Sequence, residues 1–161
     1  MLWQIFDLTF LIRFLTAIVG TIGFALIFRS RLRYLPLLAI GGGVTYAIYH
    51  VVAFFGAIFG AAFAASFFFA CYCEIFARIK RAPAIIFMLP CAIPIVPGSS
   101  LYYGMENLIS RDFATAAVYF EEALMVGIGI AGGILVVSIL MNVYNGIILH
   151  LKQRKQERDS K

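Results

Sequence analysis

The chain contains long apolar segments that are separated by short clusters of basic residues. Hydrophobic residues make up 63% of the chain and charged residues only 13%, which is too little charge to cover so much apolar surface in water. A membrane-spanning helix needs about 20 mainly apolar residues to cross a hydrocarbon core of about 30 Å. The sequence therefore predicts an all-α polytopic membrane protein with five transmembrane helices.

These segments divide the chain into a five-span membrane domain, residues 1–151, and a basic cytoplasmic tail, residues 152–161. We expect the spans at about residues 5–28, 35–55, 57–75, 84–109 (broken by prolines) and 123–149. The first segment has no basic residue before its long apolar stretch, so we expect a retained helix and not a signal peptide.

The apolar stretch at residues 114–151 is too long for a single span. It would form a helix of roughly 57 Å at the usual rise of 1.5 Å per residue. Glu121 and Glu122 indicate where to divide it. We expect a short interfacial segment at residues 114–120, followed by the last span.

The loops differ in charge, and this difference predicts the orientation of the chain. Clusters at residues 29–33, 78–81 and 152–161 hold 11 of the 13 Lys and Arg residues. Because cytoplasmic loops are enriched in Lys and Arg, we expect the N-terminus outside and the C-terminus in the cytoplasm. Topology thus accounts for the net charge of +5, and we expect no nucleic-acid binding.

The fourth span contains the stretch MLPCAIPIVPGSSLYYGM, residues 88–105, which cannot continue as one helix. Pro90, Pro94 and Pro97 each remove a backbone donor, and one proline in a helix interior costs about 3 kcal/mol. Irregular backbone at membrane depth occurs only where protein or a water-filled cavity surrounds it. The break is therefore expected to lie inside the structure.

We expect two half-helices, at residues 84–89 and 101–109, joined by an unwound region that ends at Gly98. Ser99 or Ser100 is expected to cap the second half-helix, because serine is a favourable N-cap residue. The free N–H groups at this helix start would attract an anion such as a carboxylate. Discontinuous helices point to the binding sites of transporters. The alternative is a structural kink that neighbouring helices fill.

Arg13 is a further candidate, because ionisable residues are expensive inside a membrane. It lies about 12 Å along the first span. Its helix face is expected to point at protein, and its guanidinium to meet a carboxylate of a substrate or partner helix. The alternative is that Arg13 snorkels outward or pairs with Asp7. The residues that share this face are Thr9, Thr16, Gly20 and Gly23.

Two asparagines and a glutamate complete the polar candidates. Asn142 and Asn145 form a stripe with Ser138 that would line a path near the cytoplasmic side, or make interhelical hydrogen bonds worth about 0.6 kcal/mol each. Glu74 precedes Arg78 by four residues, so an ion pair at the interface accounts for it without a part in transport.

Small residues at a spacing of four predict close helix contacts. The pairs are Gly56 with Gly60, together with Ala61 and Ala64, and Gly129 with Gly133. The run Gly41-Gly42-Gly43 could either add such a contact or loosen its helix. These surfaces also leave room for a partner protein.

The sequence offers no sign of catalysis. Cys71, Cys73 and Cys91 lack the spacing of a zinc site and are expected to pack as small hydrophobic residues. An intramembrane enzyme would need a nucleophile–base or metal arrangement, and neither histidine is placed for one. We therefore expect no enzyme, catalytic residue, metal or cofactor. A nucleotide-binding motif is also lacking, so transport would draw on a gradient.

The run that begins at Pro83 reads P-x-I-I-F-M-L-P-x-A-I-P-I-V-P-G-S-x-L-Y and then G-M-x-x-L-I-S-x-D-F. It resembles the membrane half of the threonine/serine exporter family, in which two five-span halves are sometimes split between two polypeptides. This chain is similar to the smaller, C-terminal half, and Cys91 stands where a smaller residue is expected. The resemblance assigns the matching residues to the site: Pro90, Pro94, Pro97, Gly98, Ser99 and Tyr102.

We therefore predict a subunit of a secondary transporter in the bacterial inner membrane that exports small carboxylate-bearing metabolites. The resemblance implies threonine, serine or a dicarboxylate such as succinate as substrate. It also implies a second membrane subunit that resembles the N-terminal half of the family. The remaining expected partner is membrane lipid. The alternative is a non-transporting assembly subunit that stabilises a partner protein.

Overall fold

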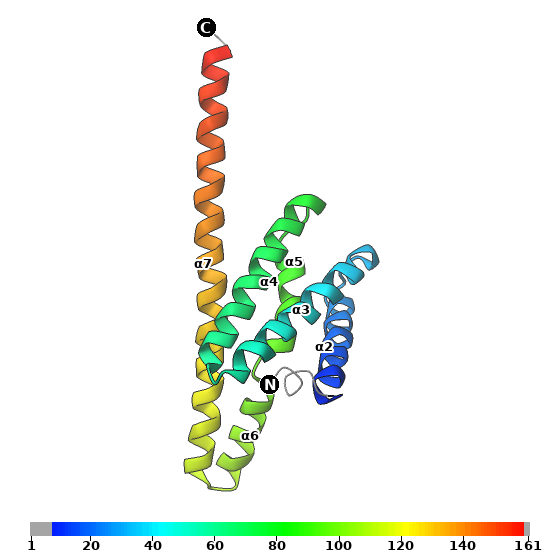
Figure 1. Ribbon diagram of the computed structural model, residues 1–161, viewed down its shortest axis with the longest axis vertical. Helices are drawn as coiled ribbons and strands as arrows, with labels where there is room; N and C mark the ends of the chain where they lie inside the picture. The colour runs from blue at the N-terminus through cyan, green and yellow to red at the C-terminus, as the bar shows by residue number, and fades with distance from the viewer. Residues whose placement is uncertain (1–7, 160–161) are drawn as a thin grey trace.

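The computed structural model describes residues 8–159, which form helices without any strand (Figure 1). Residues 5–7 of the expected first span lie outside this range. The α-helices are α2 (Leu8–Ile27), α3 (Leu35–Phe54), α4 (Ile58–Lys80), α5 (Ile85–Ala92), α6 (Gly98–Ile109) and α7 (Phe113–Asp159). There are also two short 3-10 helices, η1 (Leu32–Tyr34) and η2 (Ile93–Ile95).

Four of the described helices, α2, α3, α4 and α7, are long and apolar enough to cross a membrane. The bent pair formed by Ile85–Ile95 and Gly98–Ile109 provides a fifth crossing if it counts as one span. The predicted all-α polytopic membrane fold is thereby confirmed.

Helix α4 lies at the centre of the bundle and packs against α3, α5 and α7, while α2 covers the other side of α3. Helix α6 packs on α7, and these two helices extend beyond the rest of the bundle (Figure 1). The break between α5 and α6 therefore lies where the bundle gives way to the α6–α7 hairpin.

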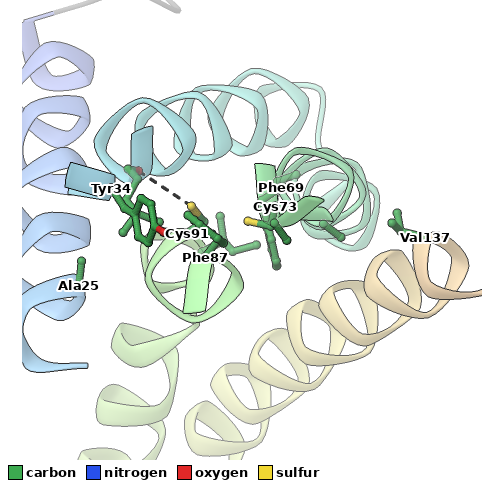
Figure 2. Packing of buried hydrophobic residues seen from close by; sticks show 12 residues of the cluster. Ala25, Tyr34, Phe69, Cys73, Phe87, Cys91 and Val137 are labelled. Carbon is green, nitrogen blue, oxygen red and sulfur yellow. Dashed lines mark hydrogen bonds between the residues drawn. The ribbon is translucent and has the colours of Figure 1, made fainter. Parts of the chain in front are cut away.

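The core forms where α3, α4 and α5 meet (Figure 2). Phe69 and Phe87 are fully buried there, and the rings of Phe87 and Tyr34 lie 5.1 Å apart. Cys73 and Cys91 are buried in the same cluster as free thiols, so they pack as small hydrophobic residues, as predicted.

The glycine run of α3 brings three helices close to it. A Cβ on Gly41 would lie 2.8 Å from the Tyr72 ring and 2.9 Å from the Cys91 sulfur. A Cβ on Gly42 would likewise clash with the Thr21 side chain on α2. Of the two alternatives for this run, the structure therefore supports close contact. The run also makes room for the Cys91 side chain.

The two predicted small-residue pairs differ in their outcome. A Cβ on Gly129 would lie 2.8 Å from the Ala62 Cβ, and one on Gly133 would lie 2.8 Å from the Phe63 carbonyl oxygen, so this pair packs α7 on α4. Gly56, by contrast, lies in the turn after α3 with φ of 81°, and a Cβ on Gly60 would approach only Ala57 of the preceding turn. Within the described chain, the predicted helix contact is therefore wrong for Gly56 and Gly60, although Ala61, which was predicted with them, is fully buried.

Helix α7 is continuous, so the expected division at Glu121 and Glu122 does not occur. Glutamate is a good helix former, and no proline interrupts this stretch. Asp112 also caps the helix start, because its carboxylate accepts hydrogen bonds from the Thr115 N–H (3.1 Å) and hydroxyl (2.7 Å). At 47 residues the helix is about 70 Å long and exceeds the thickness of a membrane.

Candidate functional site

The fourth span breaks at Val96 and Pro97, where the axes of the flanking helices differ by 54°. The first half-helix continues to Ala92 and passes directly into η2, so the unwound region is shorter than predicted. Pro90 is buried inside α5, and Pro94 lies in η2.

The serines do not cap α6, and that prediction is wrong. Pro97 occupies the N-cap position, and no side chain bonds to the helix start. The Pro97 carbonyl already accepts a hydrogen bond from the Leu101 N–H at 3.1 Å, so the helix begins at Gly98. Ser99 and Ser100 therefore lie in the first turn, Ser99 exposed and Ser100 buried.

The start of α6 has space beside it. A Cβ on Gly98 would meet no atom within 4 Å. The Gly98 N–H bonds to the Val96 carbonyl at 2.8 Å, while the next N–H groups of a helix start have no partner within their own helix. Because these groups carry the positive end of the helix dipole, the site suits an anion.

An apolar groove of about 550 Å³ runs from this point between α6 and α7. Leu124 and Ile128 on its wall are 65% and 62% exposed, so the groove is not enclosed by this chain. The complete lining is Pro97, Leu101, Phe120, Ala123, Leu124, Gly127, Ile128 and Ala131. None of these residues has a polar side chain, so the groove by itself offers no counter-charge to a carboxylate.

The residues just before the break lie inside the bundle, as predicted. Pro90, Cys91 and Ile95 are buried, and α5 and η2 pack against α2 and α3. Tyr102, however, lies on the surface of α6 with 65% of its area exposed, where its ring contacts Tyr103.

Arg13 lies on an exposed face of α2. Its neighbours Gly20 and Gly23 have no atom within 4 Å of an added Cβ, whereas the buried residues of α2 are Thr21 and Ala25. Within the described part of this chain no helix covers this face at Gly20 and Gly23, so its packing against protein stays a prediction. Asp7, the alternative ion-pair partner, lies outside the described residues.

A polar row that sequence analysis missed begins at Arg13. The Arg13 guanidinium lies close to the Tyr46 hydroxyl on α3. Tyr46 acts electrostatically on Tyr49, one turn further along α3, and so does Glu122 of α7. The available signal was the polar cluster TYAIYH within an otherwise apolar span.

His50 lies next to this row. Its ring centroid is 6.0 Å from that of Tyr46 and 4.9 Å from that of Phe10. Its Nδ1 atom is buried and has no hydrogen-bond partner among the described residues.

The asparagines are part of neither the polar row nor the start of α6. Asn142 and Asn145 are exposed on the C-terminal half of α7, whereas α6 packs on its N-terminal half (Figure 1). Glu74 pairs with Arg78 at 3.9 Å, which is the predicted i, i+4 ion pair. The guanidinium of Arg78 also lies 5.5 Å from the centre of the Tyr144 ring. Among the described residues, no cluster of His, Cys, Asp or Glu could hold a metal.

Comparison with known proteins gives one match. Residues 13–140 match the family model described as Threonine/Serine exporter, ThrE. The match covers about four-fifths of the chain and contains Arg13, the polar row and the whole broken span, but it ends before Asn142. No curated protein and no solved structure matches the chain.

Proposed function

Because the chain belongs to the threonine/serine exporter family, we propose that it is one subunit of a secondary transporter that exports small carboxylate-bearing metabolites. The proposed substrates are threonine, serine or a dicarboxylate such as succinate. The proposed location is the bacterial inner membrane, with the N-terminus outside and the C-terminus in the cytoplasm.

The broken fourth span carries this proposal. It places the start of α6 beside open space at Gly98, next to a bundle of membrane helices. A carboxylate would accept hydrogen bonds from the N–H groups of Ser99 and Ser100, and the helix dipole would stabilise its charge. The side chain of Ser99, which is exposed, can add a further hydroxyl donor.

Two surfaces support a second membrane subunit. The groove beside α6 lacks an outer wall, so it would need another protein to become an enclosed path. The exposed face of α2 carries Arg13 next to Thr16 and Gly20, and an arginine in contact with lipid is costly. A second subunit that covers both surfaces would complete the path and supply a partner for Arg13.

The position of the basic loops supports the proposed orientation. Arg29 and Arg31 of one loop and Lys80 and Arg81 of another line the same cavity, so two basic clusters lie at one end of the bundle. The C-terminal end of α7 points the same way (Figure 1). Under the positive-inside rule this end faces the cytoplasm.

The alternative function, a non-transporting assembly subunit, has less support. It rests on glycine surfaces that would bind a partner. Gly129 and Gly133 are used within the chain against α4, and so is the run at residues 41–43 against α2, α4 and α5.

The proposal is tested by expressing the chain with and without its membrane partner and measuring efflux of labelled succinate and threonine from cells. Efflux that needs both proteins is the expected result. Efflux from this chain alone would contradict the two-subunit arrangement. No efflux from either, despite stable insertion of both proteins, would contradict export of these substrates and favour the assembly role.

A further inference from the structure

A small cavity of about 260 Å³ lies between the loop after α2 and the loop after α4. Four cationic residues line it: Arg29, Arg31, Lys80 and Arg81. None of its lining residues is acidic. Like charges from two separate loops therefore line one cavity, and although all four residues are exposed, their combined field favours an anion there.

Ser30 is an independent sign of a ligand. It lines the same cavity and is only 7% exposed. Its hydroxyl oxygen is buried and has no hydrogen-bond partner among the described residues. A buried hydroxyl without a partner is destabilising, and such groups are rare in folded proteins. A rotation of the Ser30 side chain toward the cavity would let an anion there accept this hydroxyl's hydrogen bond.

The two loops share the same backbone hydrogen-bond pattern around one arginine each. After α2, the Ser30 N–H bonds to the Ala25 carbonyl at 2.9 Å, and after α4 the Ala82 N–H bonds to the Ala77 carbonyl at 3.0 Å. The turn residues, Arg29 and Arg81, adopt left-handed conformations with φ of 53° and 50°. Glycine fits such a position with less strain, so each loop places a cation where glycine would be more stable.

The surroundings of the cavity are apolar. Phe28 and Ile86 belong to its lining, and Ile27, Ile79 and Ile85 nearby in the sequence are 70%, 62% and 55% exposed. A ligand there would meet cations at one end and hydrocarbon at the other. Basic pockets between transmembrane helices at the cytoplasmic surface suit anionic lipid headgroups.

We propose that this cavity binds a phosphate group, and that the phosphate belongs to an anionic phospholipid. The arginines would pair with the phosphate oxygens, Ser30 would donate a hydrogen bond to one of them, and the acyl chains would lie along the exposed isoleucines. Binding at this site does not depend on the transported substrate.

The test uses the full chain in nanodiscs and measures its thermal unfolding midpoint. Three conditions are compared: phosphatidylcholine alone, phosphatidylcholine with phosphatidylglycerol, and phosphatidylcholine with inorganic phosphate. We expect the anionic lipid to raise the midpoint and inorganic phosphate to leave it nearly unchanged. An equal rise with inorganic phosphate would support the phosphate site but overturn the lipid as its source.

Matched variants distinguish lipid binding in this cavity from a general effect of surface charge. We expect Arg81→Gln and Ser30→Ala to lose most of the shift caused by phosphatidylglycerol. The controls are Arg111→Gln and Ser110→Ala, both in the loop after α6. Arg111 has a similar φ of 61°, but neither residue lines the cavity. Both variants should therefore keep the shift caused by phosphatidylglycerol. An undiminished shift in Ser30→Ala and Arg81→Gln would overturn the proposal. If Arg81→Gln fails to insert, Ser30→Ala decides, since it removes only an unpartnered hydroxyl.

Discussion

The Ser66 hydroxyl on α4 donates a hydrogen bond to the backbone carbonyl of Gly129 on α7, over a distance of 3.2 Å. The same hydroxyl lies 2.9 Å from the Phe63 carbonyl of its own helix. Ser66 is fully buried, and this contact is possible because Gly129 and Gly133 let the two backbones approach. The α4–α7 interface therefore depends on the absence of side chains at these two positions.

Gly133→Ala is expected to weaken this interface. The new Cβ would clash with the Ser66 hydroxyl and lie 2.8 Å from the Phe63 carbonyl oxygen and the Phe67 nitrogen. Overpacking of this kind costs typically about 1–3 kcal/mol. Unfolding in mixed micelles measures the loss. Gly146→Ala is the control in the same helix, since its Cβ meets nothing within 4 Å and should not reduce stability. Equal behaviour of the two variants would contradict the packing described for α7.

Gly42→Ala is expected to separate α2 from α3. Its Cβ would lie 2.8 Å from both the Cβ and the Cγ2 of Thr21. Because the obstacle is one side chain, adding Thr21→Gly should recover part of the lost stability, with a coupling energy of about 0.5–3 kcal/mol in a double-mutant cycle. Gly20→Ala, which has open space around it, serves as the control. Strictly additive effects at residues 21 and 42 would argue against this contact.

Asp112 makes the start of α7 sensitive to pH. The hydroxyl and the backbone N–H of Thr115 donate hydrogen bonds that lower the pKa of the Asp112 carboxyl below its ordinary value. A lowered folded-state pKa means that this stabilisation is complete above the ordinary pKa of about 3.9 and is lost as the pH falls through the folded value.

Amide hydrogen exchange in the first turn of α7 measures this effect. Protection should fall on acidification in the wild type. Asp112→Asn keeps a capping oxygen and should remove the dependence on pH, whereas Asp112→Ala should lose protection at every pH. An unchanged acid response in Asp112→Asn would assign the titration to another group.

Gly98→Leu is expected to abolish efflux without disturbing the fold. The new side chain would occupy the open space at the start of α6 and keep a carboxylate from the helix N–H groups. Efflux of labelled substrate from cells, normalised to inserted protein, measures the effect, with Gly146→Leu as the control. Ser99→Ala combined with Ser100→Ala tests the hydroxyls of the same turn. Full transport by well-inserted Gly98→Leu would rule out the start of α6 as the substrate site.

Arg13→Gln is expected to lower efflux by about 10- to 100-fold. This factor corresponds to the loss of one charge-assisted hydrogen bond to the carboxylate that the substrate or the second subunit would supply. Arg13→Lys should retain part of the activity, because it keeps the charge without the forked geometry. Arg111→Gln, at the turn after α6, should transport normally. Normal efflux by Arg13→Gln would mean that Arg13 serves only the structure of α2 and its contact with Tyr46.

Local sequence patterns predicted the class of protein, the approximate positions of α2, α3 and α4, and the site of the break. Each of these follows from local chemistry: the length of apolar segments, and prolines that remove backbone donors at Pro90, Pro94 and Pro97. The resemblance of the proline-rich run to an exporter family also came from contiguous residues.

Tertiary structure alone decided which helix faces meet. Lipid is as apolar as the packed interior, so the hydrophobic pattern of a membrane helix does not reveal its buried face. For this reason two similar glycine pairs differ: among the described residues, Gly129 and Gly133 pack on another helix, whereas Gly56 and Gly60 do not. Ser30 and Arg81 likewise line one cavity although they are far apart in the chain, and only packing brings them together.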